Sequence, residues 1–476
     1  MQRSEKNDGG HLHGCANRMF QLVDSFADCF KTNSPNNTQL ASRYVSGLLS
    51  QTQRKNMERM DERLGDDGAL GEDIYQATQQ FISASRWDDG AVYRQLCERA
   101  DGRLGGSPDT VLVIDESCHT KKGDSSVGVG QQYNGRLGKQ DNCQVGVYSA
   151  LNCGTRVALI GARLFIPQDW IENPERCRKV GVPEDRIEQG HLTKINHARE
   201  LIDEALANGV NFACVCVDAL YGRNAALRQS MEECAITYCA DIPANARLFA
   251  SKPEMSERPK QITKSTQSAG ELARKALAQN KTSPTQTVQL REGDHGIVEA
   301  KVKAIRVWEW TEESPQPEEI WLIIRVMPDG DNKLSLSNAN AGTSLKRLAR
   351  WQAGRFWVER CFQDAKSHCG MGQYQARGWR AWHHHMALVA LAVYFQMEER
   401  LTDPGGIANL TAADITEMIE WVIIRKPSEA ELLGRIERRH QAREQSKSAA
   451  IKRQRKKSRQ KSHGISETKS GWNITK

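Results

Sequence analysis

Two aspartates follow apolar runs, at positions where carboxylates can meet at one edge of a sheet. Asp115 follows the β-branched run of residues 110–114, and Asp218 follows the apolar run of residues 211–217. Such runs are typical of strands buried on both faces, and neighbouring parallel strands bring their carboxyl ends together. Hard divalent cations prefer carboxylate oxygens as ligands. The pair predicts a Mg²⁺ site, although a strand-end aspartate also commonly caps the following turn.

Glu116 is the alternative to Asp115 as the first carboxylate of such a site, because the two residues are adjacent. Neighbouring side chains on a strand point to opposite faces of the sheet. Only one of the two can therefore face the other members of the site, and we favour Asp115.

A third carboxylate lies between two cations at helical spacing. Arg355, Glu359 and Lys366 fall within residues 341–369, which have the pattern of a helix. At about 100° per residue, Arg355 lies about 40° and Lys366 about 20° from Glu359 around the axis, so the three share one face. The pattern fits a surface ion-pair ladder, or a carboxylate flanked by cations that contact phosphate.

The elements that must position these residues follow an order that few folds share. Three strands precede an alternation of helices and strands, as in the ribonuclease-H-like core, so we expect an α/β fold of that kind. The expected strands cover residues 110–115, 144–151, 156–166, 211–218 and 235–241, and the expected helices cover 192–207, 223–234, 341–369 and 379–399. Residues 39–64 and 72–100 predict two N-terminal helices, and residues 288–336 predict further strands.

The composition is that of a soluble globular protein. The chain has 476 residues, of which 39% are hydrophobic and 26% are charged. The longest strongly apolar stretch, residues 386–395, is half the length that crosses a bilayer, and residues 1–14 have no secretory pattern, so we expect a cytoplasmic protein without a membrane anchor. Thirteen cysteines without a Cys-x-x-Cys pair predict mostly reduced thiols and no structural zinc.

The net charge of +7 is concentrated near the C-terminus. Residues 425–461 contain 14 basic and 4 acidic residues, so the rest of the chain is slightly acidic. A basic block of this kind suits the phosphates of DNA, although a solvated, disordered tail has the same composition. The residues predicted to contact DNA here are Lys452, Arg453, Arg455, Lys456 and Lys457.

The spacing around Glu359 resembles the signature of bacterial insertion-sequence transposases of the DDE type. That signature is Tyr, two residues, Arg, three residues, Glu, six residues, Lys, and Arg355, Glu359 and Lys366 stand at those intervals. Gln352 replaces the Tyr, and the neighbouring Trp351 can substitute for the ring in packing but not for the contact of the hydroxyl.

A closer resemblance is to the insertion-sequence family numbered seven hundred and one, through short motifs in the same order between residues 40 and 395. These motifs are Tyr44-Val-Ser-Gly-Leu-Leu49, Arg54-Lys-Asn-Met57, Ile114-Asp-Glu-Ser117, Lys121-Lys-Gly123, Ser126-Val-Gly-Val129, Gln132-Tyr133, Gly135-Arg-Leu-Gly-Lys-Gln-Asp-Asn-Cys-Gln144, Val217-Asp-Ala-Leu-Tyr-Gly222 and Trp379-Arg-Ala-Trp-His-His-His-Met386. Several separated motifs in the same order argue against a chance match.

The resemblance implies a catalytic triad of Asp115, Asp218 and Glu359 that holds two Mg²⁺ ions, for which Mn²⁺ can substitute. It implies a bacterial transposase that cleaves double-stranded DNA at the inverted-repeat ends of its element and joins those ends to target DNA, as a homodimer that brings two ends together. The alternatives are a DNA-binding or regulatory protein without catalysis, and a ribonuclease-H-like nuclease that does not join strands.

On this interpretation the chain has five parts. They are a helical DNA-binding region at 1–105, the first part of the catalytic core at 106–245, a β-rich insertion at 246–340, the second part of the core at 341–400, and a C-terminal helical region with the basic tail at 401–476.

Further residues have candidate roles around this core. Lys121 and Lys122, together with Arg355 and Lys366, are predicted to contact DNA phosphates. Three tryptophans of the insertion are predicted either to stack on a displaced base or to pack in a sheet, namely Trp308, Trp310 and Trp321. The three histidines at 383–385 resemble a metal cluster, but packing and capping at the start of a helix explain them as well.

Overall fold

The structure is a computed structural model that describes most of the chain. The described residues are 8–65, 73–135, 137–254, 266–279, 285–293, 296–310, 316–327, 332–401, 410–424, 441, 444–445, 447–449 and 451–452. The chain divides into two units, Met1–Ile423 and Ile424–Lys476, and the fold below is that of the first. Most of the predicted basic tail, including Arg453, Arg455, Lys456 and Lys457, lies outside the described residues.

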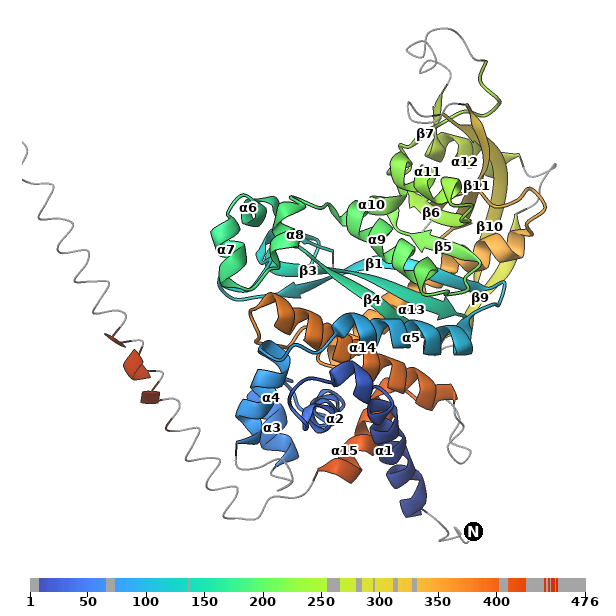
Figure 1. The fold of residues 1–476 in the computed structure, drawn as a ribbon. Coiled ribbons are helices and arrows are strands. Elements are labelled where there is room, and N and C mark those ends of the chain that lie inside the picture. The colour runs from blue at the N-terminus through green and yellow to red at the C-terminus, as the bar shows by residue number, and fades with distance from the viewer. Residues whose placement is uncertain are drawn as a thin grey trace, which may run out of the picture. The chain divides into compact units, whose positions relative to one another are not determined.

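A mixed sheet of ten strands runs through the first unit (Figure 1). The strands follow the order β2-β3-β1-β5-β6-β12-β11-β10-β9, and β4 pairs with β3. Their bounds are β1 Thr110–Thr120, β2 Gly130–Asn134, β3 Lys139–Cys153, β4 Arg156–Phe165, β5 Cys214–Val217, β6 Tyr238–Ile242, β9 Gln286–Gly293, β10 Gly296–Glu309, β11 Glu318–Val326 and β12 Asn332–Ser337. A second, two-stranded sheet consists of β7 (Arg247–Leu248) and β8 (Gln267–Ser268).

The strand directions give the large sheet a parallel centre and antiparallel flanks. β1, β5 and β6 are parallel neighbours, whereas β3 and β4 on one side and β12 to β9 on the other pair antiparallel. All residues of β5 and β6 are buried, as their continuous apolar patterns predict. The α/β class expected from the sequence is confirmed, and the β-rich segment continues the central sheet through the pairing of β12 with β6.

Helices cover both faces of the sheet. α9 (Lys194–Ala207) packs on β1, β3 and β4 from one face, whereas α13 (Leu345–His368), α14 (Trp379–Leu401) and α5 (Asp89–Leu104) pack from the other (Figure 1). The remaining helices of this part are mostly short. They are α6 Gln168–Ile171, α7 Pro174–Lys179 and α8 Glu184–Glu188 between β4 and α9, α10 Ala219–Gly222 and α11 Ala225–Glu233 between β5 and β6, and α12 Ala269–Ala278 after β8.

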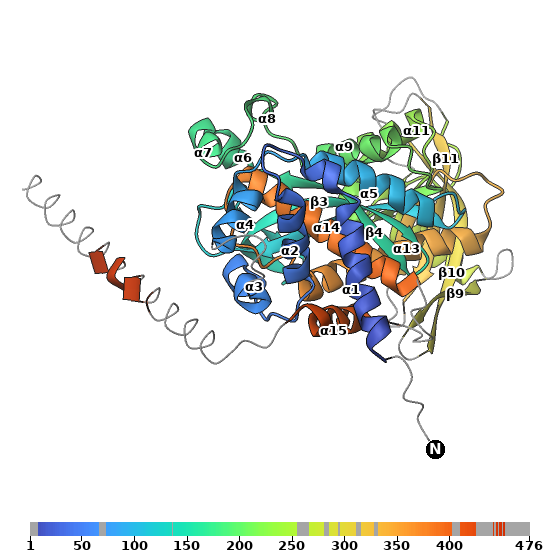
Figure 2. The ribbon, with the colours of Figure 1, turned by 60° about the horizontal axis from the view of Figure 1, so that its bottom comes forward.

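α14 is the helix on which the N-terminal region assembles. It is buried along most of its length, as expected of a helix that is apolar around most of its circumference. One side packs on β4, and the other contacts α1, α2, α4 and α15 (Figure 2). The helices of this region are α1 Asp8–Asp24, α2 Asn37–Leu48, α3 Met57–Leu64 and α4 Ile74–Ser83, with a 3-10 turn at Ala27–Phe30. α15 (Ala412–Ile423), which follows α14 in the chain, packs against α1. No helix in the described part of the chain has the length and apolarity that a membrane span requires.

Two stretches predicted as continuous helices are each interrupted. Within residues 39–64, α2 ends and α3 begins, because the Asn56 side chain accepts a hydrogen bond from the Arg59 backbone and caps a new helix. Between the two helices, the buried Lys55 ammonium donates to the carbonyl oxygens of Leu48 and His368, which end α2 and α13. The stretch predicted at residues 72–100 is also interrupted, since α4 ends at Ser83 and α5 begins at Asp89.

The three histidines of α14 take part in packing. His384 stacks on Trp87 with a centroid distance of 3.7 Å, and Nδ1 of His385 is hydrogen-bonded to the Tyr44 hydroxyl at 2.8 Å. Nδ1 of His383 lies 3.0 Å from the carbonyl oxygen of Trp379. His384 and His385 thereby join α14 to the N-terminal region.

Burial of His385 predicts a loss of stability in acid. Burial, aided by the charge of Lys121, lowers the pKa of His385 to about 3. Between this pH and about 6.5, the ordinary pKa, the unfolded chain binds a proton that the folded protein excludes. The free energy of unfolding therefore falls as the pH drops from about 6.5 towards 3, by up to about 4 kcal/mol from this group. Urea unfolding at a series of pH values measures the slope.

His385→Gln removes the titrating group, so the unfolding free energy of this variant should fall less steeply with acid than that of the wild type. His191→Gln, at an exposed position, is the matched control. An unchanged slope in His385→Gln contradicts the assignment.

Gly354 permits the close approach of α13 to β1. A Cβ atom at this position would lie 2.9 Å from Cγ2 of Val111 and 3.2 Å from Oδ1 of Asn152, so the helix must shift to accept a side chain. Gly102 in α5 is also helical, but a Cβ atom there would meet open space. The two glycines therefore separate helix propensity from packing.

We expect Gly102→Ala to raise the free energy of unfolding by about 0.5–1 kcal/mol, because alanine is the better helix former. Gly354→Ala should lower it by about 1–3 kcal/mol, because the clash with β1 outweighs the same gain in propensity. Denaturant unfolding measures both values. A stabilised Gly354→Ala protein would show that α13 does not depend on this close approach.

Candidate active site

Three aspartates lie in one transverse row across the parallel strands. Ile114 of β1 pairs with Val217 of β5, and Val217 pairs with Ala240 of β6. The next residue after each of these positions is an aspartate, and the three are Asp115, Asp218 and Asp241. The row marks the level at which β5 ends.

The expectation that Asp115 ends its strand is wrong. β1 continues to Thr120, because residues up to that position pair with β3. β5 ends at Val217, so β1 runs on beyond its parallel neighbour. Asp115 is consequently held in the middle of a strand, at the level where β5 stops.

Asp115 and Glu116 point to opposite faces of the sheet, as strand alternation requires. Oδ2 of Asp115 contacts Arg355 of α13. The Glu116 carboxylate instead pairs with the ammonium of Lys194 on α9 at 2.9 Å and accepts a hydrogen bond from the Tyr221 hydroxyl at 3.3 Å. Of the two, Asp115 is the one that faces the helix carrying Glu359.

The guanidinium of Arg355 joins three carboxylates. Its Nη1 lies 2.7 Å from Oδ2 of Asp241, and its Nη2 lies 3.2 Å from Oδ2 of Asp115 and 3.5 Å from Oε1 of Glu359. Because two oxygens next to one nitrogen must be near each other, Asp115 and Glu359 are brought together although they are distant in the chain. The side chain of Arg355 is 11% exposed and that of Glu359 is 55% exposed, so the pair opens to solvent on the Glu359 side.

The charges of this cluster influence one another strongly. Burial raises the pKa of Asp115 to about 6; the Arg355 guanidinium opposes this rise, and the Asp218 carboxylate adds to it. Burial disfavours the charge of Arg355, but the carboxylates of Asp115 and Asp241 outweigh burial and raise the pKa of Arg355. Acidic charge therefore exceeds what Arg355 alone neutralises.

Asp218 caps the helix that follows its strand, which is the role expected of a strand-end aspartate that does not bind a metal ion. Its Oδ1 accepts hydrogen bonds from the backbone of Leu220 at 2.8 Å and of Tyr221 at 3.2 Å, at the start of α10. These hydrogen bonds fix the carboxylate beside Asp115, and both use the same oxygen. Capping and a role in the site are therefore compatible.

As a donor set, Asp115, Asp218 and Glu359 fit a hard divalent cation, because they offer carboxylate oxygens and two of them repel each other. In their present positions, however, Arg355 lies between Asp115 and Glu359. Among the described residues, no three His, Cys, Asp or Glu side chains are arranged to hold a metal ion. A cation that uses the same oxygens of Asp115 and Glu359 therefore competes with the Nη2 of Arg355.

Asp241 and Ser335 belong to this cluster but were not predicted from the sequence. Oδ1 of Asp241 accepts a hydrogen bond from the Ser335 hydroxyl at 2.5 Å, and the Ser335 oxygen accepts one from Nε2 of Gln352 at 2.7 Å. The signal that could have found Asp241 is a third apolar run that ends in an aspartate. Gln352, in the signature position of the Tyr, has a defined partner here, because its amide reaches β12.

The lysines predicted to contact DNA have different surroundings. The ammonium of Lys121 lies 3.3 Å from the centre of the Tyr374 ring and donates to the Tyr374 carbonyl oxygen at 3.0 Å. Burial lowers the pKa of Lys121 to about 7. Lys122 is exposed, Lys366 is partly buried in the last turn of α13, and Lys452 is exposed in the second unit. Their contacts with DNA remain predictions, and in this structure Lys121 is engaged by Tyr374.

The three tryptophans of the β-rich segment are partly buried. The backbone of Trp308 in β10 pairs with that of Phe249, and Nε1 of Trp321 in β11 donates to the carbonyl oxygen of Asn340 at 3.3 Å. Trp310 follows the end of β10. Stacking of these rings on a base remains a prediction.

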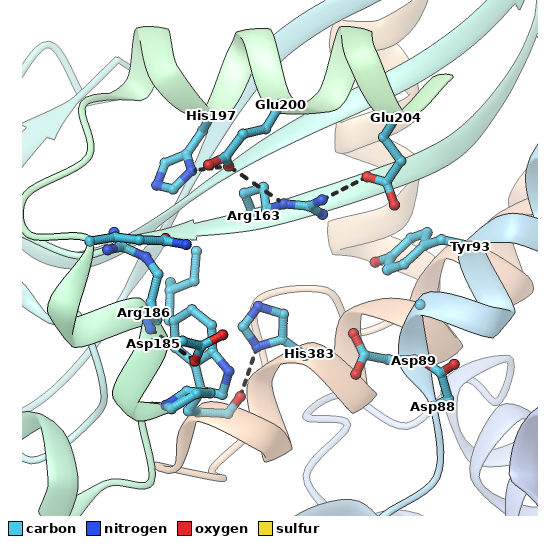
Figure 3. Close-up of a pocket in the computed structure, with 15 residues that line it drawn as sticks. Asp88, Asp89, Tyr93, Arg163, Asp185, Arg186, His197, Glu200, Glu204 and His383 are labelled. Atoms are coloured by element: carbon cyan, nitrogen blue, oxygen red, sulfur yellow. Dashed lines mark hydrogen bonds and ion pairs between the residues drawn. The ribbon is translucent and has the colours of Figure 1, made fainter. Parts of the chain in front are cut away.

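A cavity of about 460 Å³ lies away from the carboxylate row, between α5, α8, α9 and α14 (Figure 3). Arg163 pairs there with Glu204 at 2.8 Å, and Nδ1 of His197 lies 2.9 Å from Glu200. The predicted triad does not line this cavity. Much of its charge is paired internally, so we assign it no role in the chemistry.

All thirteen cysteines are free thiols in the structure. Cys214 and Cys216 are buried in β5 and act as small apolar side chains in the sheet.

Comparison with known proteins shows the family of the chain. The family described as DDE superfamily endonuclease matches residues 25–313, which is more than half of the chain. The chain belongs to the DDE superfamily endonucleases. A probable transposase for insertion sequence element IS701 from Microchaete diplosiphon is 28% identical over 232 residues, which cover 47% of this chain and 54% of that protein. The chain thus matches about half the length of this relative.

The part of this DDE superfamily endonuclease that matches the family includes Asp115, Asp218 and Asp241. It ends before α13, so Glu359 and Arg355 lie outside the matched residues. The assignment of Glu359 therefore rests on the signature spacing and on its contact with Arg355 beside Asp115.

Proposed function

We propose that this protein is a transposase that cleaves DNA at the inverted-repeat ends of an insertion sequence and joins the ends to target DNA. The observation that supports this most directly is the meeting of Asp115 and Glu359 at one guanidinium, with Asp218 beside Asp115 in the strand row. Three carboxylates from β1, the end of β5 and α13 are the residues that a DDE site requires.

We infer a ribonuclease-H-like core for the same region. The strand order β4-β3-β1-β5-β6, in which the first three strands are antiparallel and β5 and β6 are parallel to β1, supports this inference. Asp115 and Asp218 lie at the level where the parallel strand β5 ends, and the carboxyl ends of parallel strands are where α/β sheets bind their ligands.

Two bound Mg²⁺ or Mn²⁺ ions would stabilise the attacking and leaving oxygens during displacement at a phosphodiester. The residues of the chain contribute the arrangement that this chemistry needs. Asp115 is fixed by β1 and Asp218 by its capping hydrogen bonds, whereas the exposed Glu359 lies at the solvent side, from which DNA can approach. A fixed pair and an exposed third carboxylate let the site position its substrate.

Cleavage and joining can use the same carboxylates. Water is the nucleophile when an end is cut, and the released 3′-hydroxyl is the nucleophile when that end is joined to target DNA. Both are in-line displacements at phosphorus, so no covalent bond to the protein is needed.

Asp115→Asn should abolish Mg²⁺-dependent cleavage of DNA that contains the element's ends, by about a thousandfold or more, because metal ions supply several kcal/mol of transition-state stabilisation. Glu116→Gln is the matched control: it lies one residue away on the opposite face and should keep cleavage within about tenfold of the wild type, since the amide oxygen remains an acceptor for Lys194 and the amide nitrogen can donate to the Tyr221 hydroxyl oxygen. A gel assay on end-containing DNA measures both. Full cleavage by Asp115→Asn, or inactivity of Glu116→Gln alone, would show that the wrong carboxylate has been assigned.

The same assay separates the competing functions. A transposase yields joined products in which the element's 3′ end is linked to target DNA, whereas a nuclease without strand transfer yields cut ends alone. A protein that only binds DNA yields neither, and its binding survives the substitution of Asp115.

The basic tail should supply part of the affinity for DNA. Each phosphate that a Lys or Arg neutralises releases counterions, so removal of residues 424–476 should weaken binding and make it less dependent on salt. We expect the slope of log affinity against log salt to become shallower by about 0.9 for every phosphate that the tail neutralises. Titration of labelled DNA at several salt concentrations measures it, and an unchanged slope would exclude the tail from the DNA interface.

A further inference from the structure

We propose that Arg355 is an exchangeable counter-ion: Asp241 keeps hold of it while its ion pairs with Asp115 and Glu359 give way to a divalent cation. This inference rests on the proposed function, because it assumes that these two carboxylates take up the cation. It assigns to Arg355, and through it to Asp241, a positioning role in metal binding.

The two edges of the guanidinium have partners at different distances. Nη1 lies 2.7 Å from Asp241, a normal length for a charge-assisted hydrogen bond. Nη2 is shared between Asp115 at 3.2 Å and Glu359 at 3.5 Å, which are longer and weaker interactions. The weaker edge is the one that faces the predicted ligands, so it is the edge that can leave.

Asp241 is fixed in its position. Its other oxygen accepts from the Ser335 hydroxyl, which in turn accepts from Gln352. Ser335 and Gln352 are buried, and they belong to β12 and to α13. Asp241 therefore cannot follow the guanidinium towards Asp115, and it draws the Nη1 edge towards β6 instead.

The charge around Arg355 favours the exchange. The charge of Arg355 interacts with four carboxylates, those of Asp115, Asp241, Asp218 and Glu359. Arg325 of β11 is a second cation, and it interacts electrostatically with Asp241 and Glu359. Among the described residues, the ion pairs of Asp115 and Glu359 are with Arg355 and not with Arg325. The carboxylates in this cluster, four in number, thus outnumber its two positively charged guanidinium groups. A divalent cation and Nη2 would repel each other at the same oxygens, so the two alternate.

Direct Mn²⁺ binding to the full chain without DNA tests the exchange, by calorimetry or by the electron paramagnetic resonance signal of free Mn²⁺. Arg355→Gln should raise the affinity at least about tenfold, because the competing charge is gone. Asp115→Asn identifies the site, since the tight binding must disappear in this variant. Arg355→Lys, which keeps one charge but cannot span Asp241 and both ligands, should give an intermediate affinity.

Arg325→Gln is the matched control for charge. It removes a cation that interacts electrostatically with Asp241 and Glu359 but forms no ion pair with Asp115 or Glu359 among the described residues. Its effect on Mn²⁺ affinity should therefore be much smaller than that of Arg355→Gln. Equal effects of the two variants would mean that only the general charge of the region matters, and the exchange would be excluded.

Ser335→Ala tests the tether without a change of charge. Removal of the hydroxyl releases Asp241 to move with Arg355, so Mn²⁺ affinity should fall several-fold in the wild-type background. In the Arg355→Gln background the same substitution should have no effect, because Asp241 then has no guanidinium to hold. A fall of equal size in both backgrounds would overturn the positioning role of Asp241.

The outcomes separate this inference from the proposed function. If the wild type binds Mn²⁺ in an Asp115-dependent way and neither Arg355→Gln nor Arg355→Lys binds it more tightly, the counter-ion inference fails and the endonuclease remains. If no variant binds Mn²⁺ at this site, the metal-dependent function fails as well. Circular dichroism and thermal unfolding identify a variant that does not fold. If Arg355→Gln does not fold, Arg355→Lys is compared with the wild type instead.

Discussion

The site depends on one buried guanidinium that faces several carboxylates. A charged side chain at the junction of a strand row and a helix is stable only if its partners surround it. Arg355 meets Asp241 and Asp115 from two strands and Glu359 from its own helix. The positions of β1, β6 and α13 relative to one another are therefore linked through a single ion cluster, and any shift of the helix alters all of these ion pairs together.

Packing around this cluster supplies the necessary rigidity. Gly354 lets α13 approach β1 one residue before Arg355, so close backbone packing and ion pairing occur at the same place. Gln352, two residues before Gly354, reaches Ser335 on β12. The β-rich segment thus takes part in the site, since its last strand supplies a hydrogen bond to Asp241. At the far end of α13, Lys55 ties the helix to the N-terminal region.

The regular elements of the core could be predicted because their causes are local. The strands β3 and β4, the helices α9, α11, α13 and α14, and the α/β class all agree with apolar periodicity. The N-terminal helices predicted from the sequence are too long, because the chain between α2 and α3 turns to place Lys55 against two carbonyl oxygens. One of these oxygens belongs to His368 of α13, which lies 313 positions away in the chain. A pattern in the local sequence cannot predict such a contact.

By itself, the sequence determined which carboxylates are candidates, that Asp115 and Glu116 lie on opposite faces of the sheet, and which helix carries Glu359. These follow from strand alternation, helical spacing and resemblance. Only the tertiary structure decided that β1 continues past Asp115, that Asp241 completes the row, and that Arg355 lies among the acids. The physical reason is that the register between neighbouring strands and the depth at which a helix packs are set by contacts between distant segments, which leave no periodic trace in the chain.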